Sequence, residues 1–234
     1  MNILITRPLI DAEDFEDLST GPCPHTEGQC LWVGDIGNNL KNRDQLMVYV
    51  VPEPEIQLEK PFGEIEAVGL KSYPFRYPKD TVNSEALFLD QKTMDLYILE
   101  KADAAQIRLF RHPGPFIDGS EQTLETVASF PAPGIDVEYG KLITAADLHP
   151  SGRRLLVRVY SGSYEYLFDT EQTLSDISEI THTLAYPGPL SEPQGEASCY
   201  DISGTGFWTI SENQKGKDKL PLHHYSCKPG APVP

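Results

Sequence analysis

The stretch DFEDLSTGPCPHTEGQCLWVGDIGNN, residues 14–39, decides the fold. It predicts two short strands joined by a turn-rich loop. The first strand places the carboxylate of Glu16 close to the apolar Leu18, and the second, LWVGDIG, is apolar until Asp35 and a glycine. The same order of features recurs three times further along the chain, so the sequence predicts a protein built from repeats.

Each later copy has a carboxylate, then a turn, then an apolar strand that ends in a charge. The copies are NSEALFLD at 83–90 with LYILEK at 96–101, TAADLH at 144–149 with LLVRVY at 155–160, and GEASCYD at 195–201 with FWTISE at 207–212. Over all four copies, the first-strand carboxylates are Glu16, Glu85, Asp147 and Glu196. The charges that end the second strands are Asp35, Glu100 followed by Lys101, Arg158, and Glu212.

Successive first-strand acids lie about 50 to 70 residues apart, and each interval has the pattern of about four strands. Four-stranded units at this spacing are typical of β-propeller blades. The last copy has three strands, and residues 2–10 predict one strand ahead of the first copy. We therefore expect one all-β domain, a four-bladed propeller closed by pairing of the N-terminal strand with the last blade. The expected blades are 11–75, 76–131, 140–186 and 193–227.

A β-sandwich is the alternative fold, but it does not explain why each unit carries one carboxylate. The formal charge of −16 disfavours nucleic acids and anionic membranes as partners, because both are polyanions. It permits cations and basic partners, although an acidic surface is also a common route to solubility. We expect a monomer.

No apolar run approaches the roughly 20 residues that a membrane-spanning helix needs. The start, MNILITRPLI, has no basic residue ahead of its apolar part and lacks a small-residue cleavage site. It predicts a strand and not a signal peptide.

The four cysteines allow three disulfide pairings, and the sequence alone does not choose among them. Cys23 and Cys30 flank a turn-rich loop between two neighbouring strands. Cys199 and Cys227 lie in the first and third strands of the last copy. Our preferred interpretation is two disulfides in an oxidising, extracytoplasmic compartment, and four reduced cysteines in a cytosolic protein is the alternative.

A set of motifs spread over about residues 11–227 resembles a group of predicted bacterial β-propellers, mostly labelled hypothetical or esterase-like phytase-related. The motifs are DFEDL, GDIGNN with the following Arg43, VVPEP, YPKD, SEALFLD, LYILEK, TAADLHPSGRRLLVRVY, EPQGEA and TISE. Members of this group usually have Trp where Phe15 stands and often an acid where Asn38 stands. They also tend to carry a further blade before DFEDL, so the resemblance implies a shortened protein or a natural four-bladed version.

The first strand of each propeller blade lines the central axis, so the four first-strand acids are expected to converge there. Four like charges in a narrow space repel one another unless they take up protons, water or cations. Calcium binds six to eight oxygen ligands, so we expect a Ca²⁺ site at these acids. At one mouth of the axis, Asp35, Asn38, Glu100 and Glu212 are expected to add ligand oxygens. The cationic side chains of Lys101 and Arg158 are the alternative to a metal as counter-charges for these acids. With Arg158, the alternative is a network of arginine–carboxylate ion pairs in place of the metal site.

The alternative interpretation is structural: each acid accepts hydrogen bonds from backbone N–H groups of the neighbouring blade and holds the ring together. Motifs of common enzyme families are missing, and the six histidines do not recur at equivalent repeat positions. The sequence therefore favours an extracytoplasmic binding module with an axial cation and an unidentified small-molecule or protein ligand at one mouth. The alternatives are a purely structural scaffold and a calcium-dependent hydrolase, either a phosphoesterase or esterase or a lactonase-like enzyme. Whether the protein is an enzyme stays open.

Overall fold

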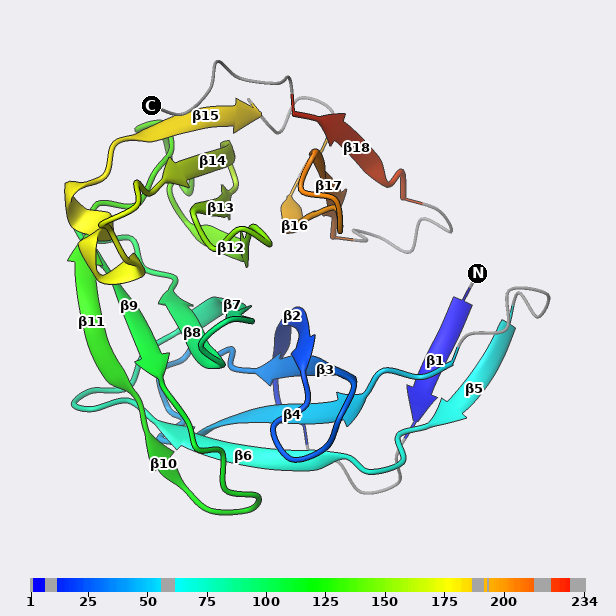
Figure 1. The fold of residues 1–234 in the computed structure, drawn as a ribbon. Helices are drawn as coiled ribbons and strands as arrows, with labels where there is room; N and C mark the ends of the chain where they lie inside the picture. The colour runs from blue at the N-terminus through cyan, green and yellow to red at the C-terminus, as the bar shows by residue number, and fades with distance from the viewer. Residues whose placement is uncertain are drawn as a thin grey trace.

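Four antiparallel sheets fan around one axis, and consecutive segments of the chain build them in turn (Figure 1). In each sheet the first strand of the segment lies nearest the axis, and the later strands lie progressively outward. The fold is a four-bladed β-propeller, as the repeat pattern predicted. The structure, a computed structural model, describes residues 2–6, 12–55, 62–186, 192, 194–212 and 220–227.

The blades are numbered in chain order. Blade 1 contains β2 (Phe15–Pro22), β3 (Gln29–Asp35), β4 (Leu46–Pro52) and β6 (Lys71–Arg76), with β10 (Gln122–Thr123) parallel to β6 at its outer edge. Blade 2 contains β7 (Ser84–Asp90), β8 (Asp95–Glu100), β9 (Ile107–His112) and β11 (Glu125–Phe130). Blade 3 contains β12 (Ile143–Leu148), β13 (Arg154–Val159), β14 (Gly162–Leu167) and β15 (His182–Tyr186). Blade 4 contains β16 (Gly195–Tyr200), β17 (Gly206–Ser211) and β18 (His223–Ser226).

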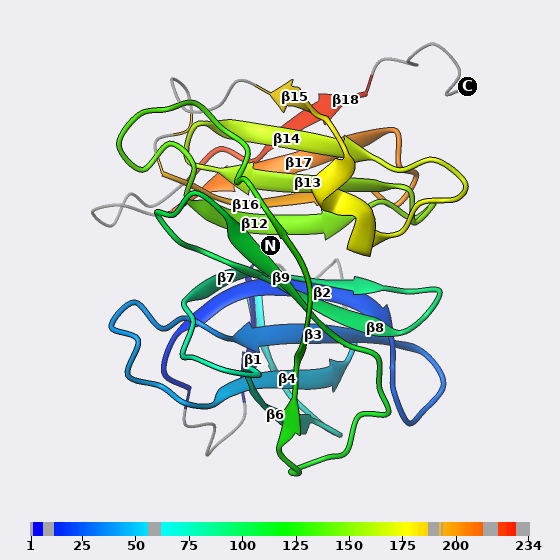
Figure 2. The same ribbon diagram turned by 90° about the vertical axis from the view of Figure 1, so that its left-hand side faces the viewer.

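Helix is scarce, as expected for this pattern. A short 3₁₀ turn, η1 (Leu174–Glu179), connects β14 to β15, and Leu174 and Ile177 bury its inner side. Within the described ranges, no helix has the length and apolar character needed to cross a membrane. In the view turned by 90°, blades 3 and 4 lie in the upper half of the molecule and blade 1 in the lower half (Figure 2).

The N-terminal strand does not close the ring as expected. Strand β1 (Asn2–Thr6) pairs in parallel with β5 (Phe62–Glu66), from Asn2 opposite Phe62 to Thr6 opposite Glu66. Strand β5 forms in the long connection between β4 and β6, so it offers β1 a free edge outside all four blades. Blade 4 therefore keeps three strands among the residues that the structure describes.

Apolar clusters fill three of the four seams between neighbouring blades. The clusters join blade 1 to blade 2, blade 2 to blade 3, and, with fewer residues, blade 3 to blade 4. Fully buried side chains on the two sides of these seams include Trp32 and Leu87, Leu109 and Val157, and Leu156 with the nearly buried Phe207. In the described part of the chain, no apolar cluster joins blade 4 to blade 1.

One of the two expected disulfides is present. Cys23 and Cys30 are bonded, with their Cα atoms 5.0 Å apart, and close the β2–β3 hairpin. The expected bridge between Cys199 and Cys227 is wrong, because both thiols are free. Cys199 lies on β16 and Cys227 follows β18, and both strands pair with β17 between them. Two strand spacings put about 10 Å between them, more than the roughly 7 Å that a disulfide can bridge.

Candidate functional site

The inner strand of every blade has a β-bulge at the same position. In β2, Phe15 lies opposite Asp35 and Asp17 opposite Gly34, so Glu16 is the extra residue. The bulges in β7, β12 and β16 skip one residue in the same way. Bulges redirect a side chain relative to the regular alternation of a strand. The four bulge residues are Glu16, Glu85, Thr144 and Glu196.

This register corrects one part of the sequence-based site. Asp147 does not occupy the position of the other three acids, because it lies three residues beyond the bulge of β12. Thr144 stands there instead, and its hydroxyl donates a 2.8 Å hydrogen bond to the carbonyl of Gly195 on β16. Blades 1, 2 and 4 therefore present a carboxylate at the bulge. Blade 3 instead presents the Thr144 hydroxyl, which already forms a hydrogen bond to blade 4.

Lys101 and Tyr160 link these acids at one end of the axis, which we call the axial mouth. The two residues directly follow β8 and β13, at equivalent positions of blades 2 and 3. The Lys101 ammonium forms an ion pair with Glu85 and donates to the Tyr160 hydroxyl at 3.2 Å. Tyr160 in turn donates to Glu196 at 3.0 Å. A continuous polar chain thus joins blades 2, 3 and 4.

Glu16 and Asp14 approach the mouth from blade 1. Both carboxylates lie where a Cβ atom at Gly37 would be, so residue 37 must be a glycine for them to come this close. Burial, followed by the charges of Glu85 and Asp14, raises the pKa of Glu16 to about 8. A carboxyl group with this pKa is largely protonated at neutral pH, which relieves part of the repulsion.

The other groups of the mouth have shifted pKa values as well. Burial raises the pKa of Glu85 to about 7 against the opposing effect of Lys101, and burial also raises the pKa of Glu196. For Lys101, burial opposes the charged form, but the hydrogen bond and charge of Glu85 outweigh it and the pKa is raised. Lys101 therefore remains an ammonium ion, the internal counter-charge of the cluster.

A cavity of about 630 Å³ opens over this network. Its volume lies within the range of small-molecule pockets, roughly 300–1,000 Å³. Ile135, Val137 and Tyr139, each more than half exposed, form an apolar rim on the connection between β11 and β12. The polar groups that line the cavity are Lys101, Tyr160, Asn39, Glu138, Ser161 and Gln194.

A second tier of acids lies deeper along the axis and holds the blades together. Asp17 of β2 accepts backbone N–H groups of Leu87 on β7 at 2.9 Å and of Ala146 on β12 at 3.4 Å. Asp147 accepts the N–H of Tyr200 on β16 at 2.8 Å. Burial raises the pKa of Asp17 to about 8 and that of Asp147 to about 7. The structural interpretation of the axial acids is therefore confirmed for Asp147.

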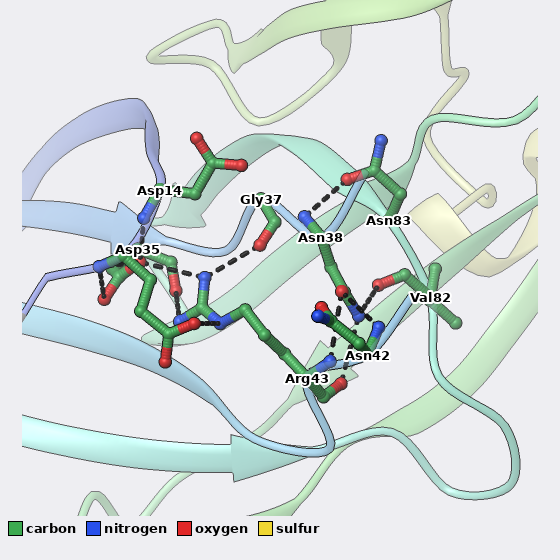
Figure 3. A network of polar contacts seen from close by, with 9 residues as sticks. Asp14, Asp35, Gly37, Asn38, Asn42, Arg43, Val82 and Asn83 are labelled. Carbon is green, nitrogen blue, oxygen red and sulfur yellow. Dashed lines mark hydrogen bonds and ion pairs between the residues drawn. The ribbon is translucent and has the colours of Figure 1, made fainter. Parts of the chain in front are cut away.

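Two of the residues expected at the mouth belong to a polar clamp between blades 1 and 2 (Figure 3). Asp35 accepts the backbone N–H of Asp14 at 2.8 Å and the guanidinium of Arg43 at 3.0 Å. Asn38 donates its side-chain amide to the carbonyls of Arg43 and Val82 and accepts N–H groups of Asn42 and Arg43. Both side chains are nearly fully buried, so their hydrogen bonds fix the loop after β3.

Glu100 lies directly before Lys101 but turns away from the cavity, where Arg108 binds both carboxylate oxygens at 2.7 and 2.8 Å. Glu212 accepts the side-chain amide of Gln194 at 2.7 Å, so it lies next to a residue of the cavity wall.

Arg158 is fully buried and pairs at 2.7 Å with Glu192, a residue that the sequence analysis did not single out. The guanidinium occupies the space that a Cβ at Gly195 would take, which explains the glycine at the start of β16. The predicted arginine–carboxylate pairing exists, but it lies in the seam between blades 3 and 4.

No group of three or more His, Cys, Asp or Glu side chains in the described ranges has the arrangement of a metal site. The acids of the mouth are instead interleaved with Lys101 and Tyr160. A calcium site therefore stays a prediction.

Solved structures include chains that are similar to this one. No family model matches the chain, and no curated protein matches it. The WD40 domain of Toxoplasma gondii coronin is similar at 11% identity and a TM-score of 0.42, over 92% of this chain and 57% of that one. The chain thus spans little more than half the length of that structure. The assignment of the fold as a propeller rests on the strand order within the four blades.

Proposed function

We propose that this protein is a binding module whose ligand site is the axial mouth. The observation that carries the proposal is the chain from Glu85 through Lys101 and Tyr160 to Glu196, which ties three blades together at the floor of a 630 Å³ cavity. Propellers commonly place recognition sites on such surfaces, where loops of several blades meet. The apolar rim offers nonpolar surface for contact with a ligand, and the polar groups of the floor would fix the orientation of that ligand.

Charge at the mouth favours a cationic ligand. Glu16, Glu85, Glu196 and Asp14 supply four acids, against the single ammonium of Lys101. The pKa of Glu16 is raised to about 8 because these acids are buried near one another, and a bound cation would relieve that repulsion. We propose Ca²⁺ or the cationic group of a small molecule or protein segment as the species bound there.

The same charges argue against a phosphoester substrate. Lys101 is the one basic side chain among the lining residues that the structure describes, and Glu85 already neutralises it. His149 and Ser151 form a hydrogen bond at 2.8 Å, but neither residue lines the cavity. The resemblance to propellers labelled esterase-like and phytase-related therefore does not extend to a cluster of basic residues around this cavity, among the residues that the structure describes. The disulfide between Cys23 and Cys30 supports an extracytoplasmic location.

The experiment is a set of melting curves in CaCl₂ and in EDTA, combined with calorimetric titration of Ca²⁺ into the protein at pH 8. We expect calcium to raise the melting temperature because it binds the folded state. Glu16→Gln and Glu196→Gln should reduce that increase, and the exposed Glu171→Gln serves as the matched control. A calcium effect equal in all four proteins would place the ion elsewhere. Turnover of generic phosphate or carboxylic esters that EDTA abolishes and Glu196→Gln loses would replace the binding module with the hydrolase. A melting temperature that neither calcium nor EDTA changes, without turnover, would favour the structural scaffold.

A further inference from the structure

Blade 4 ends in a strand whose outer edge is unpaired in the described part of the chain. Blades 1 to 3 have β6, β11 and β15 as their fourth strands, whereas β18 pairs with β17 on one side and forms the border of blade 4 (Figure 1). An unpaired strand edge presents free backbone N–H and C=O groups and is a template for pairing with a further strand.

The register between β17 and β18 shows which backbone groups point outward. Cys227 donates its N–H to the carbonyl of Thr205 at 2.7 Å, and Tyr225, two residues earlier, lies opposite a residue of β17. In an antiparallel ladder, residues whose backbone groups face the partner strand alternate with residues whose groups face away. Tyr225 therefore faces β17, and the N–H and C=O groups of His224 and Ser226 point to the free edge.

The side chains of β18 alternate between two faces. The Tyr225 ring packs on the ring of Tyr186 in blade 3, with 4.1 Å between the ring centroids. His224 lies on the opposite face, where its ring centroid is 4.4 Å from that of Trp208. Leu222, which is 59% exposed, and Trp208 line the open seam toward blade 1. A strand added to β18 would place every second side chain on this face.

Neither this chain nor a second copy of it is suited to cover the edge. Strand β1 is already paired with β5, and residues 228–234 include three prolines, which lack the N–H that a ladder needs. Two copies joined through β18 would meet along four residues, too few to approach the roughly 1,200 Å² that a stable interface buries. Two chains of formal charge −16 also repel each other.

We propose that the outer edge of β18 binds an extended segment of a partner protein, which becomes the fourth strand of blade 4. Backbone hydrogen bonds to His224 and Ser226 hold the segment, so they specify its conformation. The residues opposite these two share their face and are apolar, because they lie beside Trp208 and Leu222. A net positive charge on the segment matches the formal charge of the chain.

The test is an NMR titration of the full chain with a synthetic octapeptide of alternating valine and threonine that has a lysine at each end. We expect saturable binding with one site per chain. Amide hydrogen exchange of His224 and Ser226 should slow about 10-fold when the free peptide reaches about 10 times its Kd. Cys227 is the internal reference, because its N–H is already bonded to Thr205 and its exchange should change little.

Two N-methylated peptides separate backbone pairing from side-chain binding. Methylating the valine nitrogens removes the donors that face β18 when the valines lie beside Trp208, and it should weaken binding at least about 10-fold. Methylating the threonine nitrogens removes donors of the opposite edge, so this peptide should bind as the unmethylated one does. Equal affinities of the two methylated peptides would overturn the proposal.

A pair of variants locates the edge on the protein. Ser226→Pro removes an outward N–H and leaves the bonds to β17 intact, so it should weaken binding at least about 3-fold. Ser226→Ala keeps the N–H and should bind as the wild type does. Melting curves check that both variants fold, and the methylated peptides test the proposal without any variant.

Three results would contradict the proposal. They are the absence of saturable binding at millimolar peptide, slowed exchange that does not include His224 and Ser226, and a dimer of the chain that excludes the peptide. In the last case a second copy would cover the edge.

Discussion

Lys101 donates a hydrogen bond to the hydroxyl of Tyr160 at 3.2 Å, and this contact joins blades 2 and 3 at the axial mouth. Each residue also contacts an acid of a bulged inner strand, Lys101 contacting Glu85 and Tyr160 contacting Glu196. The mouth is therefore a network that spans three blades, in which one cation and one phenol hold two acids in place.

Lys101→Met should destabilise the protein at pH 8, because it leaves Glu85 buried without its counter-charge. The side chains of Lys101 and Glu85 are 10% and 6% exposed. Breaking such a pair costs about 3–5 kcal/mol when the remaining group stays charged. We expect the free energy of unfolding to fall by about 2 kcal/mol, since Glu85, with a pKa of about 7, can take up a proton. Urea denaturation measures the loss.

The control for this substitution is Lys141→Met, which breaks an exposed pair with Asp136 and should cost at most about 1 kcal/mol. The double variant Lys101→Met/Glu85→Gln should recover much of the lost stability. A double variant as unstable as the sum of the two single variants would mean that the two side chains do not interact.

Asp17→Ala should cost about 2–5 kcal/mol, because it removes the acceptor for N–H groups on two other blades. Asp17→Asn keeps one acceptor oxygen and should cost clearly less. Asp90 is a suitable comparison: it accepts the local N–H of Lys92, so Asp90→Ala should have a small effect. Thermal unfolding followed by circular dichroism orders the three variants. Equal losses in all three would refute the role of Asp17 as a tie between blades.

Stability should fall as the pH rises from about 5 to about 8.5. The folded-state pKa values of Glu16 and Asp17 are raised to about 8, above those of the unfolded chain. The folded protein therefore binds these protons more tightly than the unfolded chain does. Their stabilising contribution is complete below the unfolded pKa, near 4, and is lost as the pH passes through about 8.

Urea midpoints measured across this pH range test that direction. Glu16→Gln should flatten the dependence, because the group that takes up the proton is gone, and Glu171→Gln should leave it unchanged. A wild-type midpoint that increases steadily from pH 5 to 8.5 would contradict the assigned burial of these acids.

The cysteines should give one disulfide and two thiols. The loop closed by Cys23 and Cys30 is short, with a sequence separation of 7, so the bond should contribute about 2–3 kcal/mol. Cys23→Ser/Cys30→Ser should lower the urea-derived stability by that amount, and Cys199→Ser should change it little. Thiol titration of the unfolded, unreduced protein should find two thiols per chain, and a count of zero or four would be inconsistent with the structure.

The repeat pattern was sufficient to predict the blades, because apolar strands and turn residues are local signals. The position of Asp147 was misassigned because strand alternation alone does not reveal a bulge, and the bulge decides which residue turns toward the mouth. Asp17 was missed for the same reason, since it directly follows Glu16 and regular alternation would place the two on opposite faces.

Other features depend on contacts between distant segments, which no local pattern contains. The pairing of β1 with β5 brings residues 2–6 to 62–66 in parallel. The pairing of Arg158 with Glu192 needs blades 3 and 4 to be packed together. The convergence of Glu16, Glu85 and Glu196 was predictable from their recurrence, but Lys101 and Tyr160 acquire their roles only through the packing of blades 2 to 4.

The most direct test of the central claim, that acids of several blades gather at one mouth, is a ¹³C NMR titration of the glutamate carboxyl groups. Glu16→Gln assigns the signal of Glu16. We predict that this carboxyl titrates near pH 8 and Glu85 near pH 7, well above the ordinary value of about 4.5. Glutamate signals that all titrate near pH 4.5 would show that these side chains are separate and solvated, and would contradict the account.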